Sequence, residues 1–247
     1  MKFHEYLGKE KENLLISVLN FKEDYHFFEA LDEIYQEPLQ RLTISKREDK
    51  LIGIFYNFVH FYLYFSLSCF LRCHLSECLS SVRKGIDATL SAYKIILDPS
   101  SLEKYLNRDM YFQHIQRNVK SEIEKYPLAD SLVRVHDICS EYGSHADVSS
   151  LFYRTKDINE EGIKKSFFNY FQVPDSFEET RYYFVLTLLA FLHMFIIFKV
   201  FFNSKLIIID PPWEQKINDL RKKLESLIKR YSNLSRQGKI FNPNEVT

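Results

Sequence analysis

Glycine and proline are scarce in this sequence. The 247 residues include six glycines and seven prolines, whereas average usage is about 7% and about 5%. No Asn-Gly or Asp-Gly pair occurs, although such pairs are the strongest short-range signal of a tight β-hairpin. The composition therefore argues against a hairpin-rich fold, and we expect an all-α protein.

Cysteine is also infrequent. Four residues, Cys69, Cys73, Cys78 and Cys139, are too few for a disulfide framework in a chain of this length. Cys69 and Cys73 would share one helical face, and His74 and Cys78 the next. Four ligands along one continuous helix could not close a zinc tetrahedron without a break in that helix. We expect buried, reduced thiols and neither a metal nor a cofactor.

Neither sign of charge dominates. Lys plus Arg and Asp plus Glu number 33 each, so the formal net charge is zero. Such a chain lacks the overall positive field on which nonspecific nucleic-acid binders rely, and contact with RNA would need a local basic patch. Residues 1–12 are polar and charged, unlike a signal peptide. We expect a cytoplasmic protein.

The positions of the prolines divide the chain into helical segments. Prolines stand between the helical patterns, as their missing N–H requires, and several segments open with a small polar residue and a Glu three residues later. We expect a multi-helix bundle of about seven helices. The expected ranges are 9–36, 47–97, 101–125, 128–142, 158–172, 176–204 and 212–236.

The second of these helices is too long for an ordinary globular protein, and we expect a kink or break at residues 72–78 or at Gly85. The chain is expected to comprise an N-terminal helical segment at residues 1–45 and a bundle core at residues 46–210. An amphipathic helix and a polar tail follow at residues 211–247.

Two stretches contain no formally charged residue. Leu51 to Leu71 is 21 residues long, and Tyr182 to Phe198 is 17. These lengths lie at the lower edge of what crosses a bilayer, so the stretches are either buried core helices or membrane spans. The soluble reading is favoured, and membrane association remains the alternative.

Within the first stretch, small and polar residues recur every three or four positions. Gly53, Asn57, His60, Tyr64 and Ser68 would share one helical face. We expect this stripe to form a half-exposed seam of a soluble bundle.

The densest group of polar residues lies at residues 134–154. It includes Tyr142 and His145, with Gly143 expected to end a helix. One interpretation is a polar pocket around His145, with Arg154 or Arg83 supplying positive charge; the other is an ordinary helix end. Arg83 and Asp87 are four residues apart, which suits an ion pair within one helix and, if the pair is buried, would mark a functional polar site.

Two segments carry a resemblance to known proteins. The sequences SSVRKGIDATLSAYKIILDP and, further on, SEYGSHADVSS resemble those of uncharacterised bacterial all-helical proteins and, more distantly, HEPN-like helical bundles. The resemblance implies a ribonuclease in which an Arg and a His, with four to six residues between them, act in a dimer cleft. Arg108 and His114 in RDMYFQH have this spacing.

A His-Asp doublet suggests a further enzymatic alternative. HD-type phosphohydrolases are all-helical and hold a divalent cation with a His, a His-Asp doublet and a later Asp. His114, the doublet His136-Asp137, and Asp147 or Asp210 could supply these ligands.

Three widespread catalytic and binding motifs are absent from the sequence. The sequence has no glycine-rich phosphate loop, nucleophile elbow or H-E-x-x-H. The leading interpretation is a noncatalytic bundle that works through an unknown protein partner or as a homodimer. The alternatives are the HEPN-like ribonuclease, the HD-type phosphohydrolase and a membrane-associated helical protein.

Overall fold

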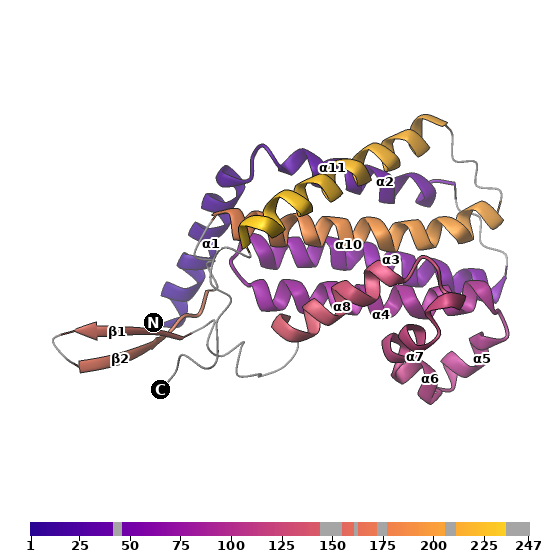
Figure 1. Ribbon diagram of the computed structural model, residues 1–247, viewed down its shortest axis with the longest axis horizontal. Helices are drawn as coiled ribbons and strands as arrows, with labels where there is room; N and C mark the ends of the chain where they lie inside the picture. Colours follow the sequence, from indigo (N-terminus) through magenta and orange to yellow (C-terminus); the bar gives the residue numbers. More distant parts are fainter. Residues whose placement is uncertain (42–45, 144–154, 161–162, 172–176, 206–210, 236–247) are drawn as a thin grey trace.

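The computed structural model describes residues 1–41, 46–143, 155–160, 163–171, 177–205 and 211–235 (Figure 1). The long helices are α1 (Phe3–Asn20), α2 (Tyr25–Leu39), α3 (Arg47–Leu71), α4 (Leu75–Leu97), α8 (Asp130–Gly143), α10 (Phe177–Ser204) and α11 (Pro211–Ser235). The short ones are α5 (Ser101–Leu106), α6 (Met110–Gln113), α7 (Ile115–Ser121) and the 3₁₀ helix η1 (Ile123–Lys125). The fold is an all-α bundle, as expected.

The number of helices was underestimated. The described part of the chain contains ten α-helices instead of about seven, because two expected helices are interrupted by residues with positive φ. Cys73 (φ 64°) separates α3 from α4, within the expected range 72–78, and Arg108 (φ 55°) separates α5 from α6. An L-residue in this conformation ends a right-handed helix. A turn at residues 21–24 likewise divides the first expected helix into α1 and α2.

The helix expected at residues 158–172 is wrong. Strands β1 (Thr155–Glu160) and β2 (Ile163–Phe168) pair there in antiparallel fashion, with Thr155 opposite Phe168 and Glu160 opposite Ile163. Figure 1 shows this hairpin projecting beyond the bundle near α1. Backbone hydrogen bonds between the two strands hold the hairpin together. A short polar sequence can form such bonds without a clear alternation of apolar residues.

Helix α10 occupies the centre of the bundle (Figure 1) and contacts α2, α3, α4, α8 and α11. Phe184, Phe191, Phe195, Phe198 and Phe202 are fully buried along it. A helix that is apolar on all sides is stable in water only when neighbours cover every side. The five surrounding helices provide that cover.

Small residues and hydroxyl groups let the neighbouring helices approach α10 closely. A Cβ atom at Gly85 would lie 3.2 Å from the Sδ atom of Met194, so glycine permits the contact between α4 and α10. The Tyr35 hydroxyl donates a hydrogen bond of 2.7 Å to the carbonyl of Phe191, and the Tyr56 hydroxyl donates one of 2.6 Å to the carbonyl of Tyr35. Because these hydroxyl groups are buried, their pairing avoids a desolvation penalty.

Both apolar helices are long enough to cross a membrane, but they differ in burial. In the most apolar part of α10, 78% of residues are buried, against 50% in α3. The bundle therefore accounts for the apolar surface of α10 and for only half of that of α3. Cytoplasmic location and membrane association both stay predictions.

The two sides of α3 give a matched test of this packing. Phe70 is 6% exposed and its ring lies 5.5 Å from that of Phe21 and 5.6 Å from that of Phe184, whereas Phe61 is 55% exposed. We expect Phe70→Ala to lower the free energy of unfolding by about 3–5 kcal/mol and Phe61→Ala to change it by about 0.5 kcal/mol or less. Urea unfolding measures both, and equal losses would contradict this arrangement.

Candidate functional site

A polar cluster lies between α4 and α8. Arg83 and Asp87 are one helical turn apart on α4, and both reach His136 on α8. The Arg83 Nε–H donates to the His136 Nε2 atom over 3.2 Å, and an oxygen of Asp87 lies 3.2 Å from the same nitrogen. The imidazole is 5% exposed, while Arg83 and Asp87 are partly exposed. The cluster is therefore accessible from its α4 side.

The two contacts at His136 Nε2 exclude each other. This nitrogen accepts from Arg83 only when it carries no proton, and it donates to Asp87 only when it carries one. The other ring nitrogen, Nδ1, lies 3.3 Å from the Ser140 hydroxyl, which also donates to the His136 carbonyl over 2.7 Å. The position of one proton therefore selects which α4 side chain binds His136.

This arrangement combines groups that acid–base chemistry needs. An imidazole beside a carboxylate can accept or donate a proton, and a guanidinium can bind a phosphate or carboxylate oxygen. Within the described residues, the Arg83 side chain makes no hydrogen bond or ion pair besides its contact with His136. Its remaining N–H groups are available to a ligand.

Arg83 and Asp87 were expected to form an ion pair with each other. The structure instead places His136 between them, with no direct ion pair recorded for these two described residues. The four-residue spacing correctly predicted a shared helical face. The contact of both residues with His136 has no signal in the sequence, because the packing of α8 on α4 determines it.

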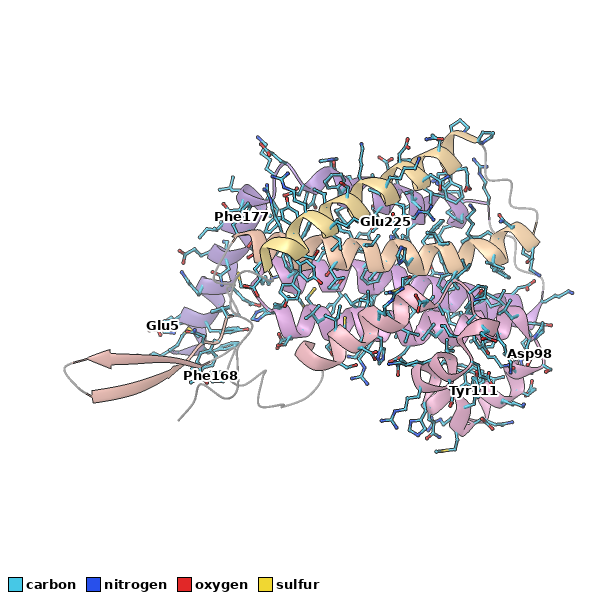
Figure 2. The ribbon with its side chains drawn as sticks, in the orientation of Figure 1. Glu5, Asp98, Tyr111, Phe168, Phe177 and Glu225 are labelled. Carbon is cyan, nitrogen blue, oxygen red and sulfur yellow. The ribbon has the colours of Figure 1, made fainter. Side chains whose placement is uncertain are left out.

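The Arg108–His114 pair is not assembled. Both side chains are exposed, Arg108 in the turn after α5 and His114 between α6 and α7, and neither makes a side-chain hydrogen bond or ion pair with another described residue. They belong to the end of the molecule that Asp98 and Tyr111 mark in Figure 2. His136 lies on a different helix, α8.

The HD-type metal site is also not assembled in the described residues. Asp137 faces away from His136 and instead accepts from Lys120 (2.7 Å) and Gln116 (3.0 Å). Among residues the structure describes, no group of three or more His, Cys, Asp or Glu side chains could hold a metal ion. The other proposed ligands, Asp147 and Asp210, lie outside those residues.

The pocket proposed around His145 cannot be located. His145 and the side chain of Tyr142 lie outside the described residues, although the backbone of Tyr142 belongs to the last turn of α8. The four cysteines are free thiols, and burial raises the pKa of Cys78 to about 12. A thiol of that pKa stays protonated and unreactive at neutral pH.

A second polar cluster, missed by the sequence analysis, joins α2 to α3. One oxygen of Asp32 binds His60 Nε2 at 2.8 Å and the Tyr64 hydroxyl at 2.5 Å, and its other oxygen accepts from Gln36 at 2.6 Å. Burial, and then the Asp32 carboxylate, raise the pKa of Tyr64. With its carboxylate fully occupied, this cluster acts as a clamp between the two helices. The stripe of His60 and Tyr64 was visible in the sequence, but their partner was not.

After Arg47 and Lys50, the exposed surface of α3 is mostly apolar, with Asn57 and Tyr64 as its exposed polar residues. Ile54, Phe58, Phe61 and Phe65 are 54%, 43%, 55% and 46% exposed, and their spacing of four, three and four residues places them in one line. We call these four residues the α3 face. The expected polar seam is only partly right, because Gly53 is buried and the exposed line runs beside it.

Different helices border the two sides of the α3 face. On the α4 side, the Lys84 ammonium lies 5.9 Å above the Tyr62 ring. On the α2 side, the Phe28 ring lies 6.0 Å from that of Tyr64, which also binds Asp32. The face is therefore a continuous helical surface between two neighbouring helices.

Comparison of the chain with protein-family models, with curated proteins and with solved structures finds no match. Arguments about function therefore rest on the two candidate sites, the cluster at His136 and the α3 face.

The burial of His136 has a measurable consequence. We expect His136→Ala to lower the free energy of unfolding by about 1–3 kcal/mol, because it leaves polar groups between α4 and α8 without their partner. His114→Ala, at an exposed site, should change it by about 0.5 kcal/mol or less. Urea unfolding of both variants compares them directly, and similar effects would argue against the cluster.

Proposed function

We propose that this protein works by binding another protein through the α3 face. The observation that carries this proposal is the line of four large, exposed apolar side chains within a stretch of 21 residues that has no charged side chain. A solvent-facing helix surface normally carries charged residues. Aromatic enrichment and depletion of charge are typical of the centre of a protein–protein interface.

A protein partner suits this surface better than lipid. Tyr56, Val59 and Leu63 are fully buried on the opposite side of α3, so lipid could not surround the helix. Surface binding to anionic lipid needs a predominantly basic border, but the border here has both signs, with Lys84 on α4 and Glu29 on α2. A polar border of mixed charge is typical of protein interfaces.

Site-specific photo-crosslinking tests this proposal. With a photoreactive phenylalanine analogue at position 61, we expect protein adducts in cells whose crosslinked peptides map to residue 61. The same analogue at Met110, another exposed apolar position, should give few adducts. When Phe58→Ser is combined with the analogue at position 61, the yield of protein adducts should fall several-fold relative to the analogue alone. Lipid adducts, or equal protein adducts at both positions, would reject a protein partner at this face.

A second candidate function is phosphodiester cleavage at His136. It is favoured by the convergence of Arg83, Asp87 and His136, which supplies a proton acceptor and a cation for a phosphate oxygen. The Arg83 and Asp87 pair and the histidine of the His136-Asp137 doublet meet at this position.

Incubation of the purified protein with mixed RNA tests the second candidate. If the cluster cleaves RNA, His136→Ala and Arg83→Gln should each lower the rate at least about 10²-fold, and His114→Ala should leave it unchanged. Loss of activity on His114→Ala alone would instead support the pair Arg108 and His114. Absence of cleavage by the unaltered protein would remove both ribonuclease readings.

A further inference from the structure

The α3 face is large enough to form the centre of a stable dimer. Four half-exposed side chains contribute about 400 Å², if each large side chain offers roughly 200 Å² in full. Tyr64 and Tyr25, which are 43% and 36% exposed, raise the total to about 550 Å². A standard interface buries about 800 Å² on each partner, so this patch supplies most of the area and a polar border supplies the rest.

The overall charge permits two copies of the chain to approach each other. The formal net charge is zero, so no long-range repulsion opposes self-association. Residues 51–71 contain no formal charge, so two α3 faces can meet without burying a like-charged pair.

The two borders of the face carry opposite charges at similar heights along α3. Lys84 lies over Tyr62 on the α4 border. On the α2 border, Glu29 is exposed and stands beside Phe28 in the sequence, and Phe28 contacts Tyr64. Tyr62 and Tyr64 differ in height by two residues, about 3 Å along the helix. On α4, the exposed Glu77 lies seven residues before Lys84 and has the opposite charge. Before α2, the exposed Lys22 lies seven residues before Glu29 and also has the opposite charge.

Symmetry determines which borders meet in a face-to-face dimer. With a two-fold axis parallel to α3, each residue keeps its position along α3 in the second copy. The α4 border of each copy then lies opposite the α2 border of the other. With the axis perpendicular to α3, each border lies opposite itself with heights reversed, so that Lys84 meets a second Lys84 when the axis crosses α3 at its height. The parallel arrangement places Lys84 opposite Glu29 and Glu77 opposite Lys22, whereas a perpendicular axis joins opposite charges only when it crosses midway between Lys84 and Glu77.

We infer that the α3 face binds a second copy of this chain about a two-fold axis parallel to α3. Lys84 of each copy then pairs with Glu29 of the other. This inference rests on the proposed function and adds to it the identity and the orientation of the partner. Phe58, Phe61 and Phe65 pack at the centre, and the two Lys84–Glu29 pairs select the parallel orientation over the antiparallel one.

Analytical ultracentrifugation of the full chain across a concentration series tests the inference. The unaltered protein should be a dimer, and Phe61→Ser should raise its dissociation constant at least about 10-fold, with Met110→Ser as the exposed control. Lys84→Glu and Glu29→Lys should each raise it about 5–10-fold, because each change opposes like charges. The double variant should recover to within about 3-fold of the original value, and Lys104→Glu, on α5, should have no effect.

Each departure from these results has a distinct meaning. Single charge variants that leave the dissociation constant unchanged would overturn the parallel orientation. A monomeric protein that still gives protein adducts at position 61 would reject the second copy and retain the proposed function. A monomeric protein that gives no such adducts, or that binds anionic vesicles through Phe61, would defeat both.

Discussion

The bundle depends on the need to cover α10 on every side. Its residues 182–198 contain no formal charge, and five helices contact it. Most of those helices are amphipathic and have a single apolar stripe to contribute, so each must turn that stripe towards α10. This requirement sets the rotation of α4 about its axis. Arg83 and Asp87 consequently lie on the side that α8 covers, and His136 completes the cluster from α8.

The charges that flank the charge-free stretch of α10 are paired with residues of neighbouring segments. Arg181 pairs with Asp24 at 2.9 Å before α2, Lys205 pairs with Asp49 of α3 at 2.7 Å, and Lys199 pairs with Glu214 of α11. Asp24 and Asp49 are themselves buried, so loss of either cation would leave an uncompensated charge in the protein interior. Charges at the ends of an apolar stretch can also indicate a membrane span. In this structure they hold α10 in register with three neighbouring segments.

Sequence patterns within a single segment predicted the helices whose boundaries depend on that segment alone. The charge-free run and the amphipathic pattern near the C terminus predicted α10 and α11 to within a few residues. The break at Cys73 falls in the predicted range 72–78, whereas the break at Arg108 was not predicted, because Arg108 has a positive φ without being the glycine that usually marks it. The hairpin at β1 and β2 was missed because Asp157 and Glu160 have the spacing of a small polar residue and a Glu three residues later, which is also typical of a helix start. At the candidate site, spacing predicted that Arg83 and Asp87 share a face, whereas their contact with His136 depends on helix packing.

The exposed side of α3 also depends on helix packing and could not be predicted from sequence. It is linked to the cluster at His136 through helix α4. The α3 stretch of 21 residues without charge has apolar residues on most sides, so composition alone cannot show which side faces the core. Helix α4 occupies one border of the α3 face with Lys84, while the preceding residue, Arg83, reaches His136. Consecutive helical residues point about 100° apart, so one helix can serve both sites with different sides. An association role at α3 and acid–base chemistry at His136 are therefore compatible in one molecule, because neither requires a side chain that the other uses.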